Sequence, residues 1–277
     1  MSNEIEIIHR SVDEATPADM PASTRRQFVT RTAAGIGGLG LLAVPGIALA
    51  TNTKNPAPPA PPPPAGANDP QTILNVAATA EVLATIVNTV GWERKIVGDW
   101  VTQRNIQAAA REELIHYDYL VSIGGVPVTK KIWVPDAVFA RRSNFLNALE
   151  VGDQIFVNAY LIATKVFGDA GNGGVAAVTA ETMAVEAVHR ALARQSNYKL
   201  GNDRAFARFN TSEEARDSPV FGGPGFTDIL DAVGQLQAAG FGFGVAGKGK
   251  GRFYDFDSVS ARTPDTVRVN TREPSAG

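Results

Sequence analysis

Two Glu-x-x-His motifs each combine a carboxylate with an imidazole, side chains that could together bind a metal ion. They are Glu113 with His116 and Glu186 with His189. On a helix, residues i and i+3 lie on one face, so the carboxylate and the imidazole of each motif could reach the same metal ion. The chain of 277 residues has 3 histidines and no cysteine. Disulfides, thiol catalysis, iron–sulfur clusters and cysteine metal sites are therefore excluded, and carboxylates must dominate any metal site.

The motifs lie in a chain whose apolar residues recur mainly at three- and four-residue steps, which indicates amphipathic helices. Four such stretches span about residues 72–89, 102–123, 143–167 and 175–196. Asp69 with Pro70 is a start signal for the first helix, and Gly91 is a stop signal. Helices of this length, joined by loops, predict an all-α fold, with a four-helix bundle over residues 70–198.

A carboxylate lies near the middle of each apolar stripe. The four residues, in chain order, are Glu81, Glu113, Glu150 and Glu186. Several ionised carboxylates in one apolar core would repel one another and would each carry a large desolvation cost. Metal cations would neutralise them, so we expect two Glu-x-x-His pairs to be completed by Glu81 and Glu150. Asp153, three residues after Glu150, is an alternative ligand. The competing interpretation is an ordinary bundle whose Glu and His side chains face solvent.

The order and spacing of these residues resemble the ligand pattern of the ferritin-like superfamily. The segments around Glu81, Glu113 and Glu186 resemble the exported ferritin-like domain of desiccation-related proteins, over about residues 70–197. This resemblance implies two iron or manganese ions, and it carries over six ligands: Glu81, Glu113, His116, Glu150, Glu186 and His189. It also implies redox chemistry with O₂ or peroxide, of the ferroxidase, peroxidase or catalase type.

The N-terminal residues 1–50 resemble a twin-arginine (Tat) signal peptide. Arg25 and Arg26 precede Phe28, an uncharged stretch follows over residues 33–50, and Ala48-Leu-Ala50 is a small-x-small cleavage pattern. A membrane anchor is the alternative, but the stretch is marginal for the ~20 residues that span a bilayer. We therefore expect the Tat translocase as a partner and export to the periplasm or cell envelope of a bacterium. The proline-rich residues 51–69 predict an extended linker.

The C-terminal residues 199–277 predict a less regular extension. A fifth helix is expected over 228–239, and a strand-like segment around 267–269. The glycine-rich run at 240–251 spells a dinucleotide or phosphate loop, but Gly249 replaces the Ser or Thr that such a phosphate loop needs for magnesium. We interpret this run as a flexible arm that packs Phe241 and Phe243 on the bundle.

The charge balance limits the partners of the protein. There are 26 basic and 28 acidic side chains, a net charge of −2, which argues against a nucleic-acid-binding protein. The expected function is a di-metal redox protein in oxidative or desiccation stress protection. The alternatives are a non-enzymatic stress-protection bundle in the cell envelope and, less favoured, an iron-storage cage. The sequence leaves the choice of metal and assembly into a homo-oligomer open.

Overall fold

The computed structural model describes residues 68–204, 206–208 and 225–265. The predicted signal peptide at 1–50, the linker up to residue 67 and the predicted strand at 267–269 lie outside the described residues. Among the described residues, most form helices, and a small sheet accompanies them.

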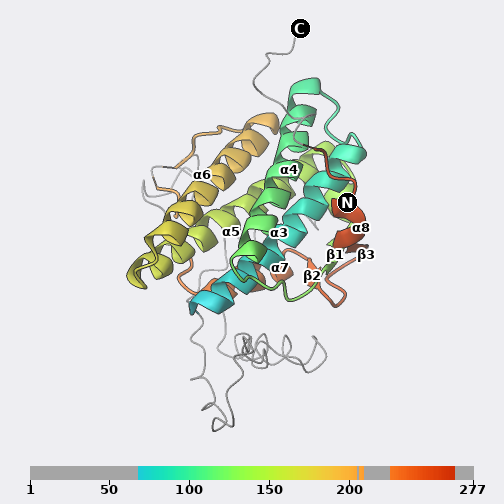
Figure 1. The fold of residues 1–277 in the computed structure, drawn as a ribbon. Coiled ribbons are helices and arrows are strands. Elements are labelled where there is room, and N and C mark those ends of the chain that lie inside the picture. Colours follow the sequence, from blue (N-terminus) through green and yellow to red (C-terminus); the bar gives the residue numbers. More distant parts are fainter. Residues whose placement is uncertain (1–67, 205, 209–224, 266–277) are drawn as a thin grey trace.

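Four long helices form the main body, as predicted. They are α3 (Pro70–Glu93), α4 (Trp100–Ser122), α5 (Arg142–Asp169) and α6 (Gly173–Ser196). They run side by side, with α3 packed most closely against α4, and α5 against α6 (Figure 1). The start of α3 follows the predicted signal, because the Asp69 side chain accepts hydrogen bonds from the backbone N–H groups of Gln71 and Thr72.

The predicted stop at Gly91 is wrong, since α3 continues to Glu93. The glycine has a packing role instead. A Cβ atom at this position would lie 2.2 Å from Cζ of Phe145, a fully buried side chain in the first turn of α5. Gly91 therefore allows the ring of Phe145 to pack directly on the backbone of α3.

We expect Gly91→Ala to destabilise the protein by about 1–3 kcal/mol, because the added methyl group overpacks the contact with Phe145. Gly152 in α5 is the matched control, since a Cβ there would meet nothing within 4 Å. Gly152→Ala should stabilise the protein by about 0.5–1 kcal/mol through helix propensity. Denaturant unfolding measures both changes, and equal effects of the two variants would contradict this role of Gly91.

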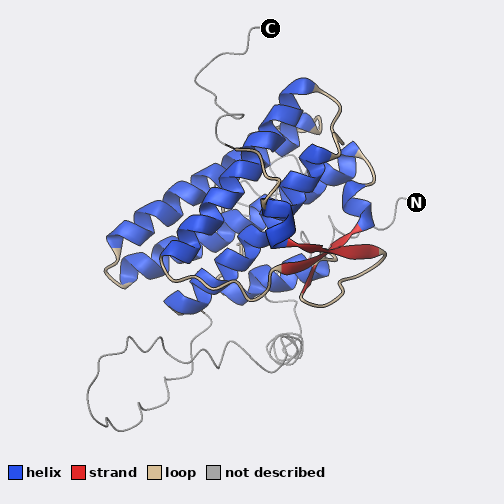
Figure 2. Ribbon diagram, turned by 45° about the vertical axis from the view of Figure 1, so that its right-hand side comes forward, coloured by secondary structure: helices blue, strands red, loops and turns tan. Residues whose placement is uncertain are grey.

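A three-stranded antiparallel sheet corrects two predictions. Strand β1 (Lys131–Pro135), predicted as loop, lies between β2 (Gly242–Phe243) and β3 (Gly251–Asp255). Figure 2 shows the strands in red beside the helical body. The glycine-rich run is therefore ordered rather than a flexible arm, although its packing role is confirmed because Phe241 and Phe243 are buried. A Cβ at Gly247 would lie 2.0 Å from the carbonyl oxygen of Gly240, so close backbone packing explains the glycine there.

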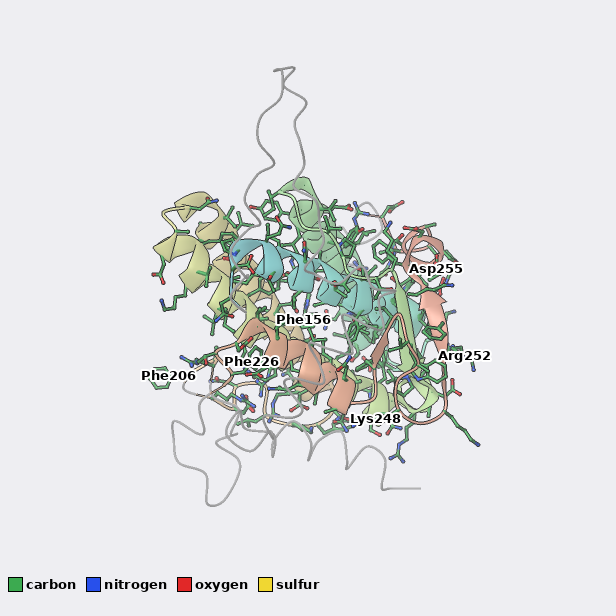
Figure 3. All side chains as sticks on the ribbon, turned by 90° about the horizontal axis from the view of Figure 1, so that it is seen from below. Phe156, Phe206, Phe226, Lys248, Arg252 and Asp255 are labelled. Carbon is green, nitrogen blue, oxygen red and sulfur yellow. The ribbon has the colours of Figure 1, made fainter. Side chains whose placement is uncertain are left out.

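The C-terminal elements cover helix α3. The predicted fifth helix is present as α7 (Ile229–Ala238), and a short helix, α8 (Phe256–Ser260), follows β3. Both contact α3, and α7 lies across the bundle beside Phe156 of α5 (Figure 3). Helix α3 is long and apolar enough to cross a membrane, but 94% of its apolar window is buried. Its composition is thus explained by its central position in the core.

Candidate metal centre

A cluster of Glu and His side chains lies inside the helical body. Its members come from three helices, namely Glu81 from α3, Glu113 and His116 from α4, and Glu186 and His189 from α6. One ligand atom from each of Glu81, Glu113, His116 and Glu186 lies within 4.8 Å of the other three. The helical spacing of each Glu-x-x-His motif directs both of its side chains inward, as predicted. This group could hold a metal ion.

The motif glutamates Glu113 and Glu186 each lie between His116 and His189. Glu113 has Oε2 3.5 Å from Nδ1 of His116 and Oε1 3.2 Å from Nδ1 of His189. Glu186 has Oε1 3.3 Å from Nδ1 of His116 and Oε2 3.6 Å from Nδ1 of His189. Each carboxylate therefore directs one oxygen towards each imidazole. Glu81 lies beside His116 alone, with its Oε2 3.8 Å from Nδ1 of that histidine.

Most polar atoms that face the centre of the cluster lack hydrogen-bond partners although they are buried. The side chains of Glu81, Glu113 and Glu186 are 0% exposed. Both carboxylate oxygens of Glu113 and of Glu186 are without a hydrogen bond, as are Nδ1 of His116 and of His189. A buried polar atom without a partner costs about 1–3 kcal/mol, and more when it is charged. Such a set of converging lone pairs is the donor arrangement that a cation would satisfy.

Burial and mutual repulsion raise the pKa of a carboxyl in this cluster. The pKa of Glu81 rises to about 7, mainly through burial and secondly through the charge of Glu113. Burial alone would lower the pKa of His116 and of His189, but the neighbouring carboxylates raise both well above the usual 6.5. These raised pKa values favour protonated side chains in the cluster, and bound protons offset the repulsion among its carboxylates.

Two further residues hold the cluster in place. Glu112 of α4 is half exposed and has Oε2 2.7 Å from Nε2 of His189. With a proton on Nε2, this contact leaves the Nδ1 lone pair of His189 directed at the cluster. Tyr160 of α5 donates its hydroxyl hydrogen bond to Oε1 of Glu81.

The structure does not bring Glu150 into the cluster. Oε1 of Glu150 accepts a hydrogen bond from Nη1 of Arg194, and Oε2 lies 2.7 Å from Nζ of Lys199. The positive charges of the Arg194 and Lys199 side chains therefore already balance this buried carboxylate. The prediction that Glu150 joins the cluster is wrong, because α6 and the segment after it supply these two charged side chains.

Asp153, the predicted alternative, is the α5 carboxylate that faces the cluster. It is buried, and its Oδ2 has no hydrogen-bond partner. Burial raises the pKa of Asp153 well above its usual value, and the charges of Glu186 and Glu113 raise it further. Asp153 and His189 also line one small cavity of about 30 Å³. Every one of the four long helices thus contributes a carboxylate at or beside the cluster.

We expect Glu150→Gln to leave metal binding unchanged and to destabilise the protein by about 1–3 kcal/mol, because it removes one partner of a buried charge pair. Metal content after dialysis and denaturant unfolding measure the two effects. Loss of metal without loss of stability would show that Glu150 is a ligand instead.

Comparisons of the chain with protein-family models, with curated proteins and with solved structures found no match. The function is therefore inferred from the geometry and chemistry of the cluster.

Proposed function

We propose that the cluster binds two iron or manganese ions, and that the protein is a ferritin-like di-metal redox protein that acts in stress protection. The observation that carries this proposal is the position of Glu113 and Glu186 between the two histidines. Each has one oxygen 3.2–3.6 Å from each imidazole Nδ1, and none of the four oxygens has a hydrogen bond. Two carboxylates in this position would bridge two ions, one beside His116 and one beside His189.

The remaining ligands follow from this assignment. Glu81 would complete the first ion position with His116, and Asp153 would complete the second with His189. Carboxylate oxygens with one imidazole per ion suit iron and manganese, which accept oxygen and nitrogen ligands. The arrangement matches the Glu and Glu-x-x-His pattern of di-metal carboxylate bundles, with Asp153 in place of the predicted Glu150.

When bound, two such ions would supply two electrons to O₂ or peroxide. The chain's own residues would hold the ligands of the ions in fixed orientations. Tyr160 fixes the rotamer of Glu81 through its hydroxyl hydrogen bond. Glu112 fixes the tautomer and the ring plane of His189. The buried position of Glu81 would exclude bulk water from the ion beside His116.

Metal analysis of the purified protein tests this proposal. After loading with Fe(II) or Mn(II) and dialysis, we expect about two ions per chain. The loaded protein should then oxidise further Fe(II) or consume hydrogen peroxide. A folded protein without stoichiometric metal would refute the di-metal site. A protein that binds two ions but does neither reaction would leave the ions with the structural role of the non-enzymatic bundle.

We also propose that the protein is exported through the Tat pathway, on the sequence of residues 1–50. Changing Arg25 and Arg26 to Lys should retain the precursor in the cytoplasm, because the arginine pair is the element that the translocase recognises. Fractionation and immunoblotting of cells that express both forms measure this. Unchanged export of the double variant would refute the Tat assignment.

A further inference from the structure

The two proposed ion positions differ in their surroundings. The position beside His116 is closed by Glu81, whose side chain is fully buried and hydrogen-bonded to Tyr160. His116 itself is 12% exposed, but its Nδ1, which faces the cluster, is buried. A second cavity lies near Tyr160, but its lining contains no cluster residue and is almost entirely apolar.

The position beside His189 instead borders a cavity. This small cavity of about 30 Å³ is lined by Asp153 and His189, and by neither Glu81 nor His116. Its wall also carries hydrogen-bonding side chains from three helices, namely Asn88, Thr102, Asn105 and Ser196. At one place in the wall, the Thr102 hydroxyl donates a hydrogen bond of 3.0 Å to Ser196 and joins α4 to α6. Asn105 and Leu192, which line the cavity, are only partly buried, so this part of the wall lies near the surface between α4 and α6.

We infer that the ion position held by His189 and Asp153 is the one that binds an exogenous ligand, and that this ligand enters through the cavity between α4 and α6. The inference rests on the proposed di-metal function and goes beyond it by assigning the open position. The ligand class is a small oxygen or nitrogen donor of two or three heavy atoms, such as peroxide or azide. The wall is largely apolar, but its polar side chains, such as Asn88 and Asn105, can hydrogen-bond such a ligand, whereas the cavity near Tyr160 has no asparagine or charged residue in its lining.

Two alanines provide a matched pair of variants to test this route. Ala109 lines the cavity and lies four residues before Glu113. Ala77 lines the apolar cavity near Tyr160 and lies four residues before Glu81. Both are buried alanines on long helices. Ala109→Leu should fill the proposed entry route, and Ala77→Leu should fill the other cavity.

The experiment uses the protein loaded with Co(II), with azide as the probe and visible absorption as the readout. We expect Ala109→Leu to slow azide association at least tenfold, while Ala77→Leu stays within twofold of the wild type. Ala109→Val, a smaller change, should give an intermediate rate of azide association. It replaces Ala109→Leu in the test if the leucine variant does not fold. Equal azide rates in folded, Co(II)-loaded Ala109 variants and wild type would overturn the proposed route. Failure of the wild type to bind Co(II) would instead overturn the di-metal site itself.

Asp153→Asn gives a second, independent test of the open position. The variant should retain the ion beside His116 and lose most of the ion beside His189, so that about one Co(II) per chain remains. The residual ion should not bind azide, because it occupies the closed position. Retention of two ions with unchanged azide affinity would overturn the assignment of Asp153 to the open position.

Discussion

The Glu113→Gln and Glu186→Gln variants should each bind less than one metal ion per chain where the wild type binds about two. Each glutamate has one oxygen near His116 and one near His189, so each substitution removes a ligand that both ions share. An amide also carries no charge, which weakens the attraction for the remaining cations. Elemental analysis after dialysis measures the loss, and circular dichroism checks that the helices persist.

The control for this series is Glu181, an exposed glutamate on the same helix as Glu186. Glu181→Gln should bind metal as the wild type does. Glu112→Gln should have an effect between those of Glu181→Gln and Glu186→Gln. Its metal affinity should be reduced about 10–100-fold, because Glu112 orients His189 without facing the ions. Equal metal content in the Glu113, Glu186 and Glu181 variants would show that the metal binds elsewhere or not at all.

The metal-free protein should lose stability as the pH rises from about 5 to 8. Glu81 has a folded-state pKa of about 7 against an ordinary value of 4.5, so in that interval the folded state binds more protons than the unfolded state. Its contribution to stability is therefore lost as the pH rises through that interval. His116 and His189, whose folded-state pKa values lie above 6.5, act with the same sign from about pH 6.5 upwards. We expect the melting temperature to fall by about 10 °C.

Metal binding should reverse this trend, because the ligands must be deprotonated to bind the ions. The rise in melting temperature that saturating Mn(II) produces should therefore grow between pH 5 and 8. Glu81→Gln should flatten the metal-free profile, since the amide does not titrate in this range. Thermal unfolding with chelator and with Mn(II) measures both profiles. A metal-free profile that is level or rises with pH would contradict the crowding of carboxylates in the cluster.

The sequence determined the four long helices and most of the cluster. Apolar residues at three- and four-residue steps specify a buried face, and each Glu-x-x-His pair must then share that face. Glu81, Glu113, His116, Glu186 and His189 could therefore be assigned to the interior from local spacing alone, and the structure brings all five together.

The choice between Glu150 and Asp153 was decided only by the tertiary structure. The two residues lie one turn apart on the same face of α5, so their spacing predicts the same orientation for both. Arg194 and Lys199, distant in sequence, balance Glu150 with their charges, and only Asp153 keeps an unpartnered oxygen beside the cluster. The contact between Glu112 and His189 likewise depends on how α4 and α6 pack.

The small sheet was also decided by tertiary structure. Strand β1 pairs with β2 and β3, whose residues lie more than a hundred positions later in the chain. Short segments of two to five residues carry too little periodicity to predict such pairing, and glycine in the run at 240–251 favours a loop when considered locally. Helices are specified by contacts within a few residues, whereas strand pairing and charge balance depend on partners that only the folded chain brings together.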